Sequence, residues 1–442
     1  MATVVTTSNK LLYENDRRGE HPSSWYAATV EPFAPQLPLQ ESLNCDVCII
    51  GAGFTGLSAA LSLAESGVDV VLLDAHRIGW GASGRNGGQL GSGQRVDQDD
   101  LEKQYGVDTA HALWDLAQAS KRCVHQLMER HGIACDYVPG IIDADHKASF
   151  SSDTEAYVEK LNREYHYDEV TFVDRQELKQ RLASDQYYSA SVDTGAGHLH
   201  PLKLATGMAR AAKACGVRIF ENTEVLSYKR TEQQVIITTS EGEVTASQLL
   251  LACNGYLGNL SAEVAAKVMP INNYIIASQV LEPSLAKSLI RDNMAVADSK
   301  FVVNYFRMSN DNRLLFGGRE SYGYRFPEDI KSFVKVAMLK VFPQLEGIGI
   351  DYGWGGTLAI TMNRMPHLTH VASNVLSSSG YSGHGVAMAT LSGKLCAQAL
   401  TGRLDDFDVM ASVKHKSFPG GALMRSPVLK LGMLYYSLRD RL

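Results

Sequence analysis

Three glycine-rich stretches carry the residue types and spacings that could do chemistry. The first, GAGFTG, places Gly51, Gly53 and Gly56 directly after an apolar run and at the start of a helical pattern. In that setting the first glycine permits a tight turn, the second admits a pyrophosphate, and the third allows close packing of helix on strand. The N–H groups at a helix start also attract phosphate. The stretch therefore predicts an adenine-dinucleotide site rather than a plain glycine turn.

An acidic residue supports this interpretation. Asp74 ends the next apolar run, close to the ~20-residue spacing at which an acid binds a ribose hydroxyl. The motif alone leaves NAD and FAD open.

The other two stretches favour FAD. GASGRNGGQ follows Asp74 closely, and GYSGHG opens a further helical pattern. Their glycines let the backbone approach a planar or phosphate-bearing surface, and Arg85 could place a positive charge beside it. The N-terminal dipole of the later helix suits the negative charge on the N1–C2=O side of a reduced flavin. An NAD enzyme has no need of two such additional loops.

Composition narrows the class of protein. The chain has 442 residues, 45% hydrophobic and 20% charged, with a net charge of -6. These values are typical of a soluble globular protein, and they argue against nucleic-acid binding, which needs a basic patch. We see no signal peptide and no run of the ~18 apolar residues that a membrane span requires. The seven cysteines then indicate reduced thiols and a cytoplasmic location, with CDVC a structural part of a strand.

The elements that must position these loops follow from hydrophobic periodicity. Val47–Ile50 and Val68–Leu73 are apolar runs on either side of a helix from about Thr55 that Gly67 ends, which makes a βαβ unit. Similar pieces recur in the middle and at the end of the chain. Between them lie helical stretches and antiparallel strands, including a hairpin around SNDN. The pattern predicts an α/β fold, with a Rossmann-like FAD-binding domain interleaved with an α+β substrate domain on a largely antiparallel sheet.

The predicted boundaries follow from these pieces. Residues 1–40 form an N-terminal arm, residues 41–97, 195–258 and 352–410 the FAD-binding domain, residues 98–194 and 259–351 the substrate domain, and residues 411–442 a C-terminal tail. For the amphipathic end of the tail we expect a helix packed on the body, with contact to a membrane surface as the alternative.

The glycine stretches resemble those of the D-amino-acid-oxidase and glycine-oxidase superfamily of flavoenzymes. Within it, the chain is most similar to the gamma-glutamylputrescine oxidoreductases, through WYAA, GHLHPLKLA, FPQLEGIGIDYGW and YYSLRDRL. The resemblance implies non-covalent FAD and oxidation of an amine, gamma-glutamylputrescine or a related polyamine derivative, by hydride transfer to flavin N5. An imine and then an aldehyde would form, and oxygen would reoxidise the flavin, giving hydrogen peroxide.

Several alternatives stay open. The substrate could be an amino acid or another N-substituted amine, and another electron acceptor could replace oxygen. A flavin-binding sensor or structural subunit is the alternative from outside the enzymes. The oligomeric state is not predicted.

The resemblance also implies a set of cofactor contacts along the three loops and at two further strand ends. These residues are Gly51, Gly53, Phe54, Thr55, Gly56, Asp74, Ala75, Arg77, Gly81, Ala82, Ser83, Arg85, Asn86, Gly87, Gly88, Gln89, Val225, Cys253, Asn254, Gly255, Gly380, Tyr381, Ser382, Gly383, His384, Gly385 and Val386. Asn363 stands where many relatives have an aspartate near the flavin.

The catalytic candidates are Arg85 and His384 at the flavin edge and Tyr305 and Arg307 on the substrate side. Tyr305 and Arg307 alternate to one face of their strand, near Tyr274. Aromatic walls suit an aliphatic amine, and Arg307 could hold a distant carboxylate. Ordinary sheet residues are the alternative. Some relatives favour oxygen with a lysine on this hairpin, so we expect Arg85 or His384 to supply the positive charge here.

Two other histidines are spaced like metal ligands. His198 and His200 share a strand face, but no carboxylate or cysteine is spaced with them. We therefore predict a structural role for both and no metal site.

Overall fold

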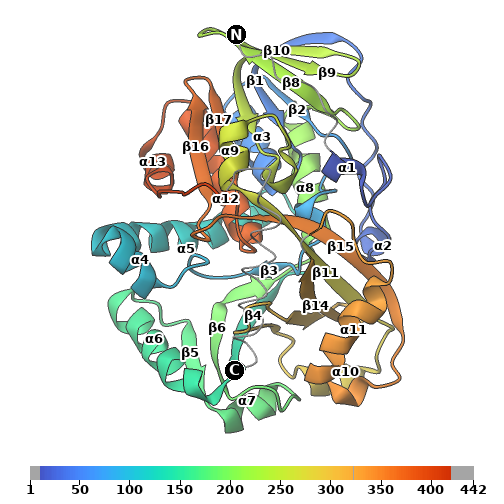
Figure 1. The fold of residues 1–442 in the computed structure, drawn as a ribbon, viewed down its shortest axis with the longest axis vertical. Coiled ribbons are helices and arrows are strands. Elements are labelled where there is room, and N and C mark those ends of the chain that lie inside the picture. Colours follow the sequence, from blue (N-terminus) through green and yellow to red (C-terminus); the bar gives the residue numbers. More distant parts are fainter. Residues whose placement is uncertain (1–9, 322, 420–442) are drawn as a thin grey trace.

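The computed structural model describes residues 10–321 and 323–419, in which the chain forms two sheets (Figure 1). The first sheet has the strand order β16-β17-β10-β1-β2-β7, with β8 and β9 attached to β10. Its strands are β1 (Ser42–Ile50), β2 (Val70–Leu73), β7 (Arg218–Phe220), β8 (Val225–Arg230), β9 (Val235–Thr239), β10 (Glu243–Leu251), β16 (His367–Ala372) and β17 (Val375–Ser379). The central strands β17, β10, β1, β2 and β7 run parallel. The predicted Rossmann-like arrangement is therefore confirmed.

Helices cover this sheet and carry two of the glycine loops. They include α3 (Phe54–Glu65), α5 (Val107–Arg130), α8 (Pro201–Ala214) and α12 (Gly385–Leu400). Helix α3 ends as predicted, with Gly67 in the left-handed region at φ +80°. Helices α3 and α12 pack together in the main hydrophobic core. A side chain at Gly393 of α12 would collide with the carbonyl of Thr55, so this close approach requires glycine.

The second sheet is almost entirely antiparallel and has the order β15-β11-β14-β13-β12-β4-β6-β3, with β5 beside β6. Its strands are β3 (Gln89–Leu90), β4 (Val138–Asp145), β5 (Val170–Val173), β6 (Ser189–His198), β11 (Met269–Ser278), β12 (Ala295–Asp298), β13 (Tyr305–Met308), β14 (Leu314–Ser321) and β15 (Ile350–Ile360). Only β12 and β4 are paired in parallel among them. β13 and β14 form the predicted hairpin. The chain first enters this sheet through β3 and finally leaves it through β15. β3 and most of β15 lie within segments predicted to belong to the FAD-binding domain.

The other helices are α4 (Gln98–Tyr105), α6 (Ser151–Glu164), α7 (Arg175–Arg181), α9 (Ala262–Lys267), α10 (Pro283–Leu289), α11 (Ile330–Val341) and α13 (Asp405–Ala411). Of these, α9 and α13 pack against β16 of the first sheet, and α4 packs against α5. Figure 1 shows α6, α7, α10 and α11 around the lower sheet. Helix α11 covers one face of it with Val334 and Met338 in a second core.

The N-terminal segment lies against the body. It contains α1 (Lys10–Tyr13) and α2 (Trp25–Thr29). Trp25 and Tyr26 are fully buried beside Leu202 and Trp354. No helix of residues 10–321 and 323–419 is long and apolar enough to cross a membrane. The predicted helix at the end of the tail lies outside the described residues.

Candidate active site

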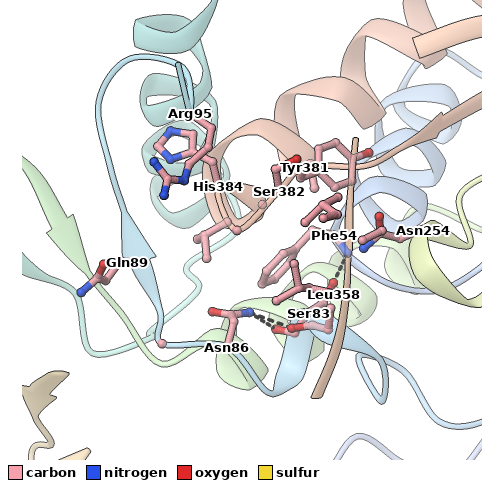
Figure 2. Close-up of a pocket in the computed structure, with 18 of the residues that line it drawn as sticks. Phe54, Ser83, Asn86, Gln89, Arg95, Asn254, Leu358, Tyr381, Ser382 and His384 are labelled. Carbon is pink, nitrogen blue, oxygen red and sulfur yellow. Dashed lines mark hydrogen bonds between the residues drawn. The ribbon is translucent and has the colours of Figure 1, made fainter. Parts of the chain in front are cut away.

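A cavity of about 840 Å³ lies where the two sheets meet. This volume is in the upper part of the range for ligand pockets. One side is formed by the ends of β1, β2 and β10, and the other by strands of the second sheet, including β4, β6, β11 and β15. Figure 2 shows part of the lining, where the three glycine loops meet.

The first loop turns sharply from β1 into α3. Gly51 has φ +106°, a conformation that favours glycine, and a side chain at Gly56 would collide with the carbonyl of Gly51. Both features match the predicted roles. Gly53 caps α3 without a side-chain hydrogen bond, so the start of the helix faces the cavity with backbone N–H groups. Phe54 N donates to Ser83 Oγ at 2.9 Å, which ties the first loop to the second.

Asp74 stands at the end of β2 and lines the cavity. Its carboxylate accepts the backbone N–H of Ala52 at 2.7 Å and of His76 at 2.8 Å. Burial raises the pKa of Asp74 to about 6, against the effect of these two hydrogen bonds. Each carboxylate oxygen has a second lone pair, which leaves acceptor capacity for ribose hydroxyls.

The second loop is held in shape by its own asparagine. Asn86 Nδ2 donates to the carbonyls of Ala82 at 2.9 Å and Ser83 at 3.0 Å, and Asn86 Oδ1 accepts from Gly88 N at 2.8 Å. Figure 2 shows Ser83 and Asn86 below Phe54. The loop thus presents a fixed backbone surface to the cavity.

The third loop leads from β17 into α12. His384 is the residue that caps α12, and Figure 2 shows it beside Arg95. Burial and then the charge of Arg95 lower the pKa of His384 to about 4, so this ring is neutral at pH 7. Its Nε2 atom is buried without a hydrogen-bond partner. This pKa argues against the expectation that His384 supplies a positive charge, and the role of His384 at the flavin edge stays a prediction.

Arg85 lines the cavity, but its charge is already compensated. Its Nη1 lies 2.8 Å from Asp16 Oδ2, and its Nε donates to the carbonyl of Trp80 at 2.6 Å. A further bond reaches the carbonyl of Gly355 at 3.1 Å. These contacts fix the second loop against β15 and the N-terminal segment. The role of Arg85 at a flavin edge stays a prediction.

Comparison with known proteins identifies the class of enzyme. Residues 46–399 match the family described as FAD dependent oxidoreductase. The chain belongs to this family. It is 43% identical over 419 residues to the probable oxidoreductase OrdL of Rhizobium meliloti, covering 95% of this chain and 97% of that protein. It is 42% identical over 424 residues to the gamma-glutamylputrescine oxidoreductase of Escherichia coli, covering 96% and 99%.

A solved structure supports the fold. The glycine oxidase of Geobacillus kaustophilus aligns with a TM-score of 0.69 and 21% identity, covering 81% of this chain and 95% of that one. The FAD-dependent oxidoreductase described here thus has the architecture of that enzyme.

The cavity lining fits FAD. The glycine turn and the start of α3, which has no side chain at Gly53, suit the pyrophosphate, Asp74 suits the ribose, and the start of α12 suits the flavin pyrimidine. The predicted residues that line the cavity are Gly51, Gly53, Phe54, Thr55, Asp74, Ala75, Gly81, Ala82, Ser83, Arg85, Asn86, Gly87, Gln89, Val225, Cys253, Asn254, Tyr381, Ser382, Gly383, His384, Gly385, Val386 and Tyr305.

A few predicted cofactor residues lie behind this lining. They are Gly56, Arg77, Gly88, Gly255 and Gly380. Gly88, with φ +75°, is required because a side chain there would collide with the carbonyl of Leu199. Arg77 pairs with Glu221 at 2.9 Å and donates to the carbonyl of Phe33 at 2.8 Å. Its predicted place at the adenosine end is wrong, because this ion pair holds it away from the cavity.

Two substrate-side predictions are also wrong. Arg307 is buried, and it donates to the carbonyls of Gly87 at 2.8 Å, Leu199 at 2.9 Å and Met308 at 3.2 Å. It therefore supports the second loop and has no place in the cavity wall. Tyr274 points to the other face of its sheet, where it packs against Phe333 under α11.

Tyr305 does line the cavity. Its hydroxyl donates to Asn273 Oδ1 at 2.5 Å. Gly87 and Gly317 lie against its ring, and a side chain at either position would collide with it. The ring is thereby held as a fixed aromatic wall.

The remaining polar candidates are structural. His198 Nε2 lies 2.8 Å from the carbonyl of Asn293, and His200 Nε2 lies 3.1 Å from Thr29 Oγ1. The part of the chain that the structure describes contains no cluster of ligands that could hold a metal ion. Asn363 bonds to the carbonyl of Lys414 at 3.1 Å and is not part of the lining.

Sequence reasoning missed a second set of lining residues, on the side of β4 and β6. It includes Arg95, Asp97, Trp114, Asp143, Tyr157, Tyr167 and Asp193. Arg95 and Asp97 directly follow the second glycine loop, which was a signal in the sequence. The others have no local motif, and only the strand register brings them together.

Proposed function

We propose that this FAD-dependent oxidoreductase oxidises the primary amine of gamma-glutamylputrescine or a related polyamine derivative to an imine, which water then hydrolyses to an aldehyde. FAD, when bound, supplies the acceptor for the hydride that leaves the carbon beside the nitrogen. The similarity to the Escherichia coli gamma-glutamylputrescine oxidoreductase, which extends over nearly both chains, is the observation that carries this proposal. The cavity wall of aromatic and carboxylate side chains suits an aliphatic amine.

The chain's own residues would bind and orient the amine. Tyr305 provides a rigid aromatic surface for the methylene chain. His384 Nε2, which lacks a partner, can accept a hydrogen bond from the substrate nitrogen. With a pKa of about 4, His384 is too weak a base to keep the amine's proton at pH 7. The substrate amine must therefore bind in its neutral form, or lose its proton to solvent after it binds.

An amino acid is the alternative substrate. It would place an α-carboxylate beside the reacting carbon, and Arg307, which was predicted to hold a distant carboxylate, is occupied by backbone carbonyls. The alternative stays open, because Arg95 also lines the cavity.

Oxygen is the proposed electron acceptor, with another carrier as the alternative. A fixed positive charge favours electron transfer to oxygen because it stabilises the negative charge that develops. Arg85 is paired with Asp16 and His384 is neutral, so we assign this role to Arg95, which lines the cavity and forms no ion pair with the described residues.

Anaerobic mixing with an amine panel tests the substrate. Gamma-glutamylputrescine should bleach the yellow flavin within seconds, whereas glycine and sarcosine should bleach it slowly or not at all. Faster bleaching by an amino acid would overturn the proposal.

Admission of air then tests the acceptor. Rapid return of the colour with release of hydrogen peroxide is expected. Reduced flavin that persists for many minutes in aerated buffer would identify a dehydrogenase.

A further inference from the structure

The part of the cavity beyond the cofactor loops has an acidic wall. In the register of β4 and β6, Ile141 pairs with Asp193, and Asp143 pairs with Ser191. Residues opposite each other, and residues two apart on one strand, point to the same face of a sheet. All four side chains therefore share one face, and all four line the cavity.

Asp143 faces the cavity without a partner. Strand β4 is hydrogen-bonded on both edges, to β6 and β12. The exposed surface of the Asp143 side chain therefore faces the cavity. Its carboxylate forms no hydrogen bond or ion pair with the described residues. Desolvation, followed by the charge of Asp193, raises the pKa of Asp143 to about 7. A positively charged ligand group beside this carboxylate would stabilise its ionised form.

Asp193 is fixed beside it. This residue is 7% exposed, and its Oδ1 accepts from Tyr167 Oη at 2.5 Å, Gly195 N at 3.0 Å and Ala196 N at 3.1 Å. Lys121 supports the tyrosine hydroxyl from behind at 2.9 Å. Oδ2 has no partner among the described residues, so one oxygen of a rigid, buried carboxylate is free for a ligand.

The chemistry of the wall favours an organic cation over a metal. No group of carboxylates and histidines in residues 10–321 and 323–419 is close enough to hold a metal ion. Trp114, Tyr157 and Tyr167 also line this part of the cavity, and aromatic faces attract ammonium groups. Arg95 and Lys300 also line the cavity and Lys121 lies against Tyr167, but none of these cations forms an ion pair with Asp143 or Asp193.

The subsite is separate from the cofactor loops. Leu90, at the end of the second loop, and Pro139 of β4 both pair with Gly197 of β6. Asp143 follows Pro139 by four residues, which is roughly 13 Å along an extended strand. A substrate that reached from the cofactor loops to Asp143 would therefore be long. Its end beside Asp143 would suit a positive charge.

We propose that Asp143 and Asp193 bind a second ammonium group of the substrate, the one that is not oxidised. This inference rests on the proposed function, and it names the substrate class as amines with two positive ends, such as a diamine or an amine with an aminoacyl head. Asp143 is the specificity-determining residue, since its carboxylate is fully available.

Matched ligand pairs and Asp143→Asn in the holoenzyme test the proposal. Putrescine is compared with butylamine, and gamma-glutamylputrescine with N-glutarylputrescine, which keeps the carboxylate, because the members of each pair differ in the distal ammonium. KM is measured for amines that are turned over and Ki for those that are not. Loss of a charge-assisted hydrogen bond should weaken binding of the dicationic member about tenfold or more, with little change for its partner. Asp168→Asn, which removes an exposed carboxylate outside the cavity, is the matched control.

Three results would overturn the subsite: no preference of the wild type for either dicationic ligand, an unchanged Asp143→Asn variant, or equal weakening of both members of a pair. Failure of the proposed function gives a different result. In that case the wild type does not oxidise gamma-glutamylputrescine, while the pairs measured as Ki still report on the subsite. Flavin content and thermal unfolding of Asp143→Asn should match the wild type, which separates a binding defect from a folding defect.

Discussion

Thr55 Oγ1 and Tyr381 Oη lie 2.6 Å apart, although 326 positions separate them in the chain. Thr55 is in the first turn of α3, and Tyr381 is in the loop that leads into α12. Ser378 Oγ is the second partner of the tyrosine hydroxyl, at 2.8 Å. One buried hydroxyl therefore joins the two helices whose N-termini face the cavity.

Tyr381→Phe should weaken both the fold and flavin retention. The substitution leaves the hydroxyls of Thr55 and Ser378 without this partner, which should lower the free energy of unfolding by about 1–3 kcal/mol. Urea unfolding and the Kd for FAD after reconstitution measure the two effects. Tyr228→Phe is the control, because that half-buried tyrosine forms no hydrogen bond with the described residues through its hydroxyl. Equal effects of the two variants would contradict the assigned role.

Asp74→Ala should lose flavin. The variant removes the acceptor for Ala52 N and His76 N together with the predicted ribose ligand, so both the loop shape and the contact are lost. Asp74→Asn keeps one acceptor oxygen and should retain more flavin than Asp74→Ala. The ratio of flavin to protein absorbance after gel filtration measures this retention. Full occupancy in Asp74→Ala would remove Asp74 from the cofactor site.

Non-covalent attachment is tested on the wild type. Acid precipitation should release the yellow colour into the supernatant, because no bond holds the cofactor once the fold is lost. Colour that stays in the pellet would show a covalent link.

Arg307→Ala should lower the free energy of unfolding rather than act directly on substrate binding. It leaves the carbonyls of Gly87, Leu199 and Met308 without their donor, at a cost of about 3 kcal/mol or more. Arg163→Ala removes an exposed arginine and should change the free energy of unfolding little. Chemical denaturation distinguishes them. An unchanged unfolding curve together with a raised KM would instead restore the original assignment of Arg307 to a substrate carboxylate.

Tyr305→Ala should lower kcat/KM by about tenfold, because the variant removes a fixed aromatic wall from the cavity. Tyr305→Phe should keep most of the activity, since the ring stays in place between its glycine neighbours. Steady-state kinetics with the preferred amine measures both. Activity of Tyr305→Ala equal to that of the wild type would place substrate binding elsewhere in the cavity.

The cofactor loops could be predicted because their requirements are local. Gly51 and Gly56 have fixed places in a strand–turn–helix unit, and Asp74 ends the neighbouring strand at a known spacing. The predicted two-sheet fold followed from the same periodic patterns. The place of Arg77 could not be predicted, since its partner Glu221 is distant in sequence and reaches it only when β7 docks beside β2.

The substrate wall was harder to predict for a physical reason. Alternation along a strand shows which residues share a face, but both faces of the second sheet are covered. One face of β11 packs under α11 and holds Tyr274, while Asn273 faces the cavity. Likewise, Asp143 and Asp193 lie in unremarkable strands, and only the register of β4 with β6 brings them together.

The final prediction is a pH dependence of substrate binding. Desolvation and the neighbouring Asp193, Asp97 and Asp145 raise the pKa of Asp143 to about 7, while Arg95 lowers it. Because this pKa lies above the usual range for aspartate, Asp143 is neutral at pH 5 and charged at pH 9. The KM for a substrate with two positive ends should therefore fall as pH rises through about 7.

A second, separate effect should appear at higher pH, where the reacting amine loses its proton and kcat/KM climbs toward the substrate's own pKa. In Asp143→Asn the first change should vanish and the second should stay. N-glutarylputrescine, which lacks the distal ammonium, should show only the second change even with the wild type. Profiles of KM and kcat/KM from pH 5 to 10 for both amines provide the measurement. A fall in KM near pH 7 that persists in Asp143→Asn would assign this titration to another group, because that variant has no carboxylate at this position to ionise.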